Sequence, residues 1–152
     1  MSLPPRVWEI PQGLRVTADG RWRVGDHQVL HPPTLRYLKA HLVFEEGSAF
    51  VVDGGRRMPV DVRGPAFEAV SLVVDDARGV ARVVLDDGSE EPVREDALRM
   101  DEESGRFECA VRGGRARALL SRAAHQTLLQ HVAEERGRFV LRAGDRVIPV
   151  RT

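Results

Sequence analysis

Phe50-Val51-Val52 and Arg57-Met58-Pro59-Val60 return late in the chain as Phe139-Val140-Leu141 and Val147-Ile148-Pro149-Val150. Outward from these stretches, Leu14-Arg15-Val16 and Gly20-Arg21-Trp22 match Leu98-Arg99-Met100 and Gly105-Arg106-Phe107. The offset is 90 residues from His41 to His131, from Gly47 to Gly137 and from Pro59 to Pro149, and it is 89 from Phe50 to Phe139. Self-similarity at a nearly constant spacing indicates the duplication of one supersecondary unit.

The composition is typical of a soluble globular protein. A chain of 152 residues can bury a core without a disulfide or a metal. Its 23 basic and 23 acidic residues cancel, which argues against a whole-chain basic surface for nucleic acid. Cys109 is the single cysteine, so an intramolecular disulfide is excluded. No apolar run reaches the roughly 20 residues of a membrane span, and Met1-Ser2-Leu3-Pro4-Pro5 lacks the regions of a signal peptide. We therefore expect a cytoplasmic protein.

The first half of the sequence predicts strands, one helix and further strands. A hairpin is expected from residues 14–16 and 21–24, because Asp19-Gly20 favours a tight turn. Pro32-Pro33 is expected to open a helix, since the missing N–H of proline needs no partner in the first turn. Leu35, Leu38 and Leu42 would give this helix its apolar face, and Gly47 is expected to end it. Further strands are expected at 50–52, 58–62, 67–74, 80–85 and 91–94.

The second half predicts the same order of elements. Phe107, Cys109 and Val111 alternate with less apolar residues, which is the period of a half-buried strand, and Gly113-Gly114 is expected to end it. A helix is expected from about residue 117 to residue 135, followed by strands at 138–142 and 146–150. Trp22 and Phe107 occupy matching places and are expected to pack each helix onto its sheet.

These patterns predict an α+β fold of two tandem β-β-α-β-β repeats, each a curved antiparallel sheet with one packed helix. The N-terminal repeat, with extra strands, is expected at residues 1–88 and the C-terminal repeat at 89–152. The charged stretch 86–95, which contains Gly88 and Pro92, is the expected linker. The junction between the repeats is where we expect a cleft, because ligand sites favour such junctions.

The segment Val111-Arg112-Gly113-Gly114, followed by Leu120-Ser121-Arg122-Ala123, resembles a motif of the bacterial family called domain of unknown function 1285. Gly20-Arg21-Trp22, the stretch from Val29-Leu30 to Leu38, and the stretch 62–67 with Pro65 resemble the same family. The resemblance spans roughly residues 13 to 150. It implies a tandem-repeat α+β fold, no established activity, and a signalling or regulatory role.

The glycine–arginine block gives the sharpest hypothesis about chemistry. A glycine pair before a helix can present backbone N–H groups to a phosphate or carboxylate, and arginine can bind either group bidentately. The predicted ligand residues are Arg112, Gly113, Gly114, Arg122 and His125, with Arg115 and Arg117 beside them. The alternative is that the glycines form only a turn, with Arg122 paired to Glu95 or Glu134.

Other chemistry receives less support from the sequence. His27 and His31 precede a proline pair, and no zinc-binding or cofactor motif is present, so neither a metal nor a cofactor is expected. Cys109 is expected to be a core residue rather than a nucleophile. The carboxylate pairs Asp75-Asp76 and Asp86-Asp87 fall at turns, where aspartate bonds the local backbone. No catalytic residue is predicted.

The sequence therefore favours a non-enzymatic module that binds a small anionic ligand or regulates a partner. The alternative is a protein–protein interaction adaptor, either a homodimer or a heteromer, without a small ligand. A hydrolase or transferase built from Arg122, His125 and a carboxylate is a third hypothesis. Neither nucleic acid nor a membrane is expected as a partner.

Overall fold

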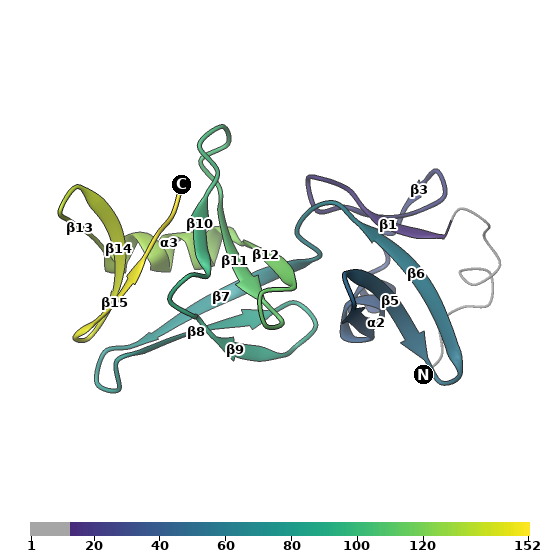
Figure 1. Ribbon diagram of the computed structural model, residues 1–152, viewed down its shortest axis with the longest axis horizontal. Helices are drawn as coiled ribbons and strands as arrows, with labels where there is room; N and C mark the ends of the chain where they lie inside the picture. Colours follow the sequence, from purple (N-terminus) through teal and green to yellow (C-terminus); the bar gives the residue numbers. More distant parts are fainter. Residues whose placement is uncertain (1–12) are drawn as a thin grey trace. The chain divides into compact units, whose positions relative to one another are not determined.

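The computed structural model describes residues 13–152, and the chain divides into a first unit ending at Ala66 and a second, Phe67–Thr152 (Figure 1). The N-terminal stretch Met1-Ser2-Leu3-Pro4-Pro5 lies outside the described residues. The sequence placed the boundary after residue 88 instead. The strands predicted at 67–74 and 80–85 are present, and they belong to the second unit because they pair within its sheet.

The described part of the first unit, residues 13–66, contains one helix and a six-stranded sheet. Its elements are β1 (Leu14–Val16), β2 (Trp22–Val24), β3 (His27–Gln28), α2 (Pro32–Ala40), β4 (Leu42–Glu45), β5 (Ser48–Asp53) and β6 (Arg56–Val62). The strand order is β3-β2-β1-β6-β5-β4. Neighbouring strands are antiparallel except for β1 and β6, which are parallel, because α2 and the strands around it carry the chain back across the sheet.

Helix α2 begins at Pro32, as predicted, but ends at Ala40 rather than at Gly47. The Val52 N–H donates to the His41 carbonyl over 3.1 Å, which draws the chain into the sheet directly after the helix. Leu42 therefore lies on β4 and not on the helix. Gly47, with a φ of 81°, occupies the tight turn between β4 and β5, where a positive φ is required.

The second unit contains one helix, a six-stranded sheet and a three-stranded sheet. Its elements are β7 (Phe67–Asp75), β8 (Val80–Leu85), β9 (Glu90–Pro92), β10 (Leu98–Met100), β11 (Phe107–Val111), β12 (Ala116–Leu120), α3 (Arg122–His131), β13 (Val132–Glu135), β14 (Arg138–Ala143) and β15 (Arg146–Pro149). The larger sheet has the order β10-β11-β12-β7-β8-β9, and the smaller one β13-β14-β15. The helix α3 packs mainly against β7.

The long helix predicted from residue 117 to residue 135 is wrong, because its two ends are strands. Residues Ala116–Leu120 form β12, which pairs with β11 and runs parallel to β7. Ser121 then starts α3: its Oγ accepts a hydrogen bond from the Ala124 N–H over 3.1 Å and donates to the Val70 carbonyl over 2.9 Å. This cap holds the helix start against the sheet and offsets unpaired N–H groups of the first turn.

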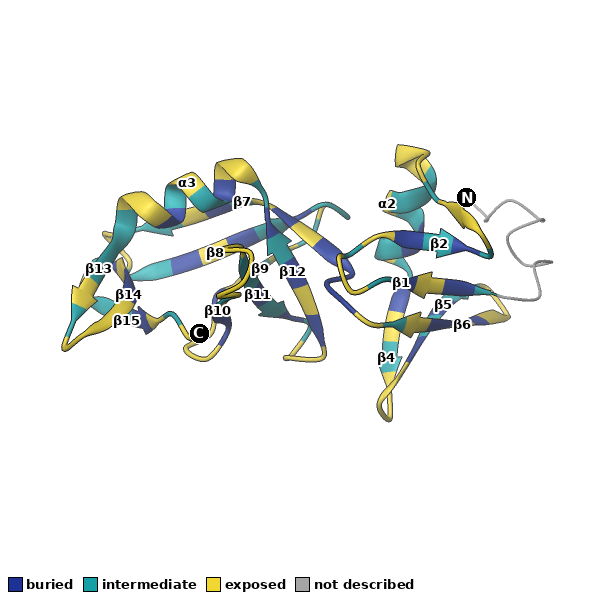
Figure 2. Cartoon of the chain, turned by 90° about the horizontal axis from the view of Figure 1, so that it is seen from above, coloured by how far each residue is buried: buried dark blue, intermediate teal, exposed yellow. Residues whose placement is uncertain are grey.

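Each unit has a core of its own, built from one face of its helix and one face of its sheet. Leu38 on α2 and Leu128 on α3 are fully buried. Trp22 is 2 % exposed, and its indole N–H donates to the Ala66 carbonyl over 2.9 Å. Buried and exposed residues alternate along many of the strands, as the period of two requires (Figure 2). The α+β class predicted from the sequence is therefore present, with more strand than expected.

Candidate functional site

A cleft of about 360 Å³ lies on the second unit, beside the edge formed by β10, β11 and β12. The charged residues that line it are Asp96, Arg99, Glu108, Arg117 and Arg151. All of the lining residues belong to the second unit, so this cleft is not the one predicted at the junction of two repeats. It is a candidate ligand site in the described part of the chain.

Strand register brings these side chains to one face of the sheet. Arg99 on β10 pairs with Glu108 on β11, and Ala110 on β11 pairs with Arg117 on β12. The next pair along these two strands, Leu98 with Cys109, points to the opposite face and is fully buried. The core therefore sets the direction of the charged residues, since a shift of one residue would expose the apolar set.

Arg151 reaches the cleft through backbone pairing with β10. The Met100 N–H donates to the Arg151 carbonyl over 2.7 Å, and the Arg151 N–H donates to the Leu98 carbonyl over 3.0 Å. These bonds place Arg151 directly beside Arg99 in a parallel bridge, where the end of the chain runs along β10 (Figure 1). Two residues that are 52 positions apart in the sequence thus become neighbours.

The charges of the cleft are unevenly paired. Arg117 forms an ion pair with Glu108, with 2.9 Å between the guanidinium nitrogen and the carboxylate oxygen. Within residues 13–152, neither Arg99 nor Arg151 forms an ion pair. Arg99 lies across from Glu108 in the sheet, and its charge contributes to the lowered pKa of Asp101. Arg99 and Arg151 are both exposed, and an anion from solution would be attracted to their guanidinium groups.

The predicted glycine pair does not lie at a helix start. Gly113 and Gly114 form the turn between β11 and β12, with φ values of 69° and 85°. A hairpin turn needs such left-handed residues, so the turn interpretation of these glycines is correct. Gly114 lines the cleft, but the helix expected directly after the glycine pair begins only at Arg122, after the strand β12.

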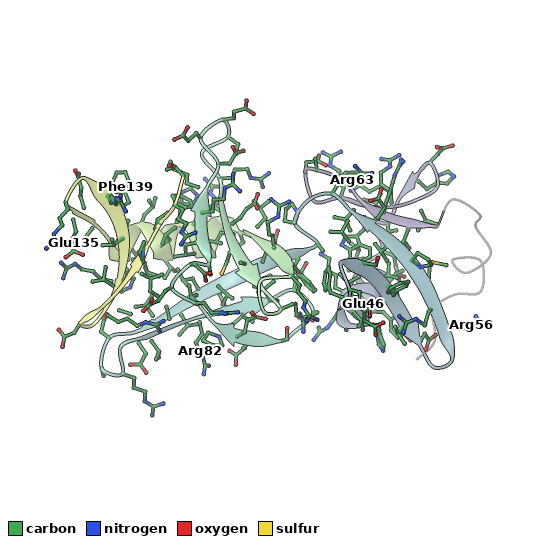
Figure 3. All side chains as sticks on the ribbon, viewed as in Figure 1. Glu46, Arg56, Arg63, Arg82, Glu135 and Phe139 are labelled. Atoms are coloured by element: carbon green, nitrogen blue, oxygen red, sulfur yellow. The ribbon has the colours of Figure 1, made fainter. Side chains whose placement is uncertain are left out.

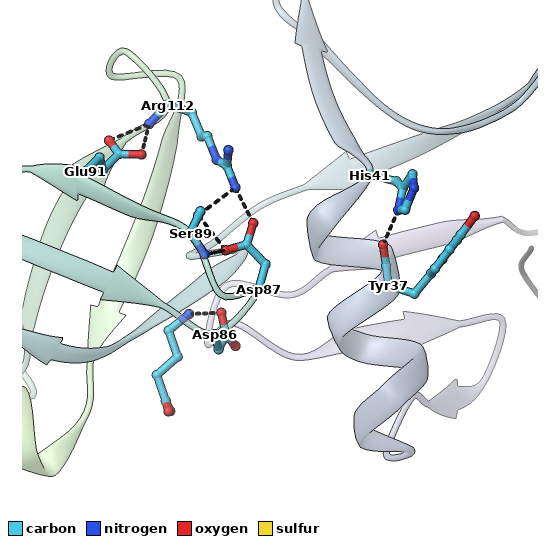
Figure 4. A network of polar contacts seen from close by, with 8 residues as sticks. Tyr37, His41, Asp86, Asp87, Ser89, Glu91 and Arg112 are labelled. Carbon is cyan, nitrogen blue, oxygen red and sulfur yellow. Dashed lines mark hydrogen bonds and ion pairs between the residues drawn. The ribbon is translucent and has the colours of Figure 1, made fainter. Parts of the chain in front are cut away.

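Arg112 is held by a polar network between two hairpins (Figure 4). Its guanidinium forms an ion pair with Asp87, donates to the Ser89 hydroxyl over 3.3 Å and lies 4.9 Å from the centre of the Phe67 ring. Its backbone N–H donates to the Glu91 carboxylate over 3.0 Å. Arg112 therefore joins the β8–β9 turn to the β11–β12 turn and serves the fold.

The network also shifts the pKa of Asp87. Burial alone would raise this pKa, but hydrogen bonds from the Ser89 hydroxyl and N–H and the charge of Arg112 together outweigh it and leave the pKa below its ordinary value. The Asp87 side chain is 4 % exposed. Its carboxylate is thus favoured in the folded state, and the benefit exists only while the group is ionised.

We expect Asp87→Asn to lower the free energy of unfolding by about 1–3 kcal/mol at pH 7. Because the folded-state pKa is depressed, the wild-type benefit is complete above the unfolded pKa of about 3.9 and disappears as the pH falls through the folded pKa. Wild type and variant should therefore converge in acid, as urea unfolding at pH 7 and pH 3 would show. Glu90→Gln is the control, since its ion pair with Arg82 is half exposed. An equal deficit at both pH values would contradict the prediction.

The remaining predicted residues lie on α3. Arg122 is exposed, and among the described residues it pairs with neither Glu95 nor Glu134. His125 packs edge-on against the Phe107 ring, with 4.9 Å between the ring centres. Phe107 starts β11 and Gly113 follows its end, so roughly 20 Å of strand separates His125 from the glycine turn. The five predicted ligand residues therefore do not form one site.

Other residues considered in the sequence have structural environments. Cys109 is buried, which together with the charge of Glu91 raises the pKa of its thiol to about 12. Asp86 accepts a hydrogen bond from the Glu68 N–H, and Asp76 accepts one from the Gly144 N–H. Within residues 13–152, no three histidine, cysteine or acidic side chains are grouped as metal ligands. Neither of the described helices, α2 and α3, is long and apolar enough to span a bilayer.

Sequence reasoning missed Arg99 and Arg151. The signal that could have found them is the repeat itself. Arg99 matches Arg15 in Leu-Arg, and Arg151 follows Pro149-Val150 as Asp61 follows Pro59-Val60. The position that is Asp61 in the first copy is Arg151 in the second, so the two copies differ in charge there.

The fold described above is that of an α+β protein with parallel and antiparallel strand pairs in each six-stranded sheet. Two solved structures of DUF1285 family proteins share it. The protein from Silicibacter pomeroyi DSS-3 is 23 % identical, with a TM-score of 0.71 over 91 % of this chain and 79 % of the other. The protein from Shewanella baltica OS155 is 15 % identical, with a TM-score of 0.59 over 80 % of this chain and 93 % of the other.

These likenesses support the resemblance to DUF1285 at the level of the fold. No protein-family model matches the sequence, and no curated protein matches it. Since a fold does not specify a function, the chemistry has to be argued from the cleft.

Proposed function

We propose that this protein is a non-enzymatic binding module that takes a small anionic ligand in the cleft of its second unit. The observation that carries the proposal is the group of Arg99, Arg117 and Arg151 around a cleft of about 360 Å³. This volume is in the lower range of ligand pockets.

The proposal predicts that anions stabilise the protein against heat. A ligand at 100 times its dissociation constant adds about 2.7 kcal/mol, which raises the melting temperature of a chain of this size by roughly 5–10 °C. Thermal unfolding with inorganic phosphate, sulfate, succinate and lactate, at constant ionic strength, would measure this shift. Arg99→Ala should abolish it, because the substitution removes an exposed guanidinium group that lines the cleft.

The matched control is Arg122→Ala, which removes an exposed arginine on α3 outside the cleft. This variant should keep the wild-type response. A shift that survives Arg99→Ala, or that disappears in Arg122→Ala, would place the ligand elsewhere. No shift with any anion would contradict the proposal.

The protein-interaction adaptor remains the second candidate. Leu129 on α3 and Phe139 on β14 are 54 % and 53 % exposed, and Figure 3 shows Phe139 on the outer hairpin near Glu135. Exposed large apolar side chains favour contact with another protein. A mass that increases with protein concentration, and returns to that of one chain in Phe139→Ser, would support this function.

We further infer that the two units contain copies of one duplicated motif. The β4–β5 turn and the β13–β14 turn have matching φ values. These are 49° and 81° at Glu46 and Gly47 in the first unit, and 53° and 78° at Arg136 and Gly137 in the second. The next turn has 60° at both Gly54 and Gly144. The duplicated motif that we infer has the element order β-β-β-α-β-β-β, from β1 to β6 and from β10 to β15. It has one more strand on each side of the helix than the sequence predicted.

A further inference from the structure

We propose that the edge of β3 that faces away from β2 takes up an extended segment of a partner protein. The segment adds to the first unit's sheet as a parallel strand with apolar side chains at alternate positions. This inference goes beyond the anion site and rests on the duplicated motif inferred above. It comes from comparing the same strand edge in the two copies, because only the second copy has it paired within residues 13–152.

Strand register identifies β3 as the counterpart of β12. Leu14 and Leu98 hold matching places in the sequence repeat. In the first unit, the residue of β2 that pairs with Leu14 pairs on its other side with His27. In the second unit, the residue of β11 that pairs with Leu98 pairs on its other side with Ala118. His27 therefore corresponds to Ala118, and β3 corresponds to β12.

The outer edge of β12 is paired with another strand of the chain. Leu120 pairs in parallel with Ala69 on β7, and the Ser121 N–H donates to the Ala69 carbonyl over 2.9 Å. With this strand in place, Ala118 and Leu120 are 0 % and 6 % exposed. Along residues 67–69 of β7, a buried apolar residue, an exposed polar one and a buried apolar one follow each other. The second unit thus shows that a parallel strand of this pattern fits the edge.

The outer edge of β3 has no such strand, because within residues 13–152 β3 is the last strand of its sheet. The Val29 N–H donates to the Trp22 carbonyl over 2.9 Å, so it faces β2. Backbone groups alternate in direction along an edge strand, and those of Gln28 and Leu30 therefore face away from β2. Such groups are a template on which a further strand can pair.

Leu30 lies beside this edge and is strongly exposed. Three residues after His27 and Ala118 come Leu30 and Ser121, so the Leu30 N–H takes the place of the N–H that bonds β7 in the second unit. The Leu30 side chain is 71 % exposed, more than any other large apolar side chain within residues 13–152. An exposed apolar side chain beside a strand edge favours coverage by another chain.

A second copy of this chain does not offer a suitable strand. β7 is already paired on both sides, with β12 and with β8. Of the other strands that end a sheet within residues 13–152, β4, β9, β13 and β15 lack the apolar–polar–apolar order of residues 67–69, and β10 is bridged to Arg151. The occupant is therefore a segment of another protein, bound by β-augmentation, in which backbone hydrogen bonds give affinity and alternate side chains give specificity.

The test uses a synthetic peptide with the sequence of residues 66–72, capped at both ends and labelled with a fluorophore. Its fluorescence anisotropy is measured with increasing amounts of the full chain. The control is the same peptide with Ala69→Pro, because proline cannot donate to a strand ladder. We expect the first peptide to bind, and the proline peptide to bind roughly 10-fold more weakly or worse.

Two variants of the chain locate the bound peptide. Leu30→Asp places a charge at the edge, and Gln28→Pro removes an N–H that faces away from β2. Each should weaken binding of the peptide roughly 10-fold, and Leu30→Asp still reports on the edge if Gln28→Pro folds poorly. Val43→Asp is the matched control, since Val43 is a 37 % exposed aliphatic residue on β4, at the other end of the same sheet. This variant should bind the peptide as wild type does.

Hydrogen exchange of the Gln28 and Leu30 amides identifies what covers the edge. We expect rapid exchange in the free chain, and exchange slowed by about 10-fold or more with the peptide. Slow exchange in the free chain would overturn the partner assignment, in favour of the chain itself if the rate is independent of protein concentration and of a second copy if it is not. Absence of peptide binding, or binding unchanged in Leu30→Asp, would overturn the site. The anion responses come from the second unit, so either proposal can fail without the other.

Discussion

Gly64→Ala is expected to lower the free energy of unfolding by about 3 kcal/mol. A Cβ atom at this position would lie 2.3 Å from the Thr17 carbonyl oxygen and 2.4 Å from the Ala18 carbonyl oxygen. Both atoms belong to the backbone, so a side-chain rotation cannot relieve the clash. The turn that carries them is held by a bond from the Gly20 N–H to the Thr17 carbonyl over 2.9 Å.

The close approach is also fixed from the other side. The Arg63 N–H donates to the Val16 carbonyl over 2.9 Å, which anchors the end of β6 to the end of β1. Urea unfolding followed by circular dichroism would measure the change. Gly55→Ala is the matched control, because its Cβ meets nothing within 4 Å, and we expect a change within about 0.5 kcal/mol. Equal effects of the two substitutions would contradict the steric argument.

Trp22→Ala is expected to lower the free energy of unfolding by about 3–5 kcal/mol. The indole ring is 2 % exposed in the core of the first unit, so its removal leaves a cavity. The substitution also removes the hydrogen bond from the indole N–H to the Ala66 carbonyl, which is itself buried. A buried carbonyl without a partner adds its own cost.

Trp22→Phe separates the two contributions, because it keeps an aromatic ring and removes the indole N–H. We expect a loss of about 1–3 kcal/mol for this variant, as for a buried acceptor left without its donor. Denaturant unfolding monitored by circular dichroism would compare the three proteins. A phenylalanine variant as unstable as the alanine variant would show that the hydrogen bond, and not the ring volume, dominates.

Most local elements were predictable from the sequence because short-range chemistry specifies them. The turn at Asp19-Gly20, the helix start at Pro32 and the alternation of β11 lie where their residues indicated. The helix predicted from residue 117 begins too early. Leu120, Ala124 and Leu128 have a helical spacing, but Leu120 is the last residue of the strand β12. Pairing of β12 with β7, whose paired residues lie 51 positions earlier in the chain, overrides that local pattern.

The candidate site depended on pairings that no local pattern contains. The sequence indicated an arginine–glycine block with an anionic ligand, but the structure engages Arg112 with Asp87 and places His125 against Phe107. Periodicity and turn chemistry act over a few residues, so the sequence by itself indicated most strands and turns and the start of α2. Which charged groups face each other, as Arg99 faces Arg151, depends on contacts between strands far apart in sequence, because only folding brings those backbones within hydrogen-bonding distance.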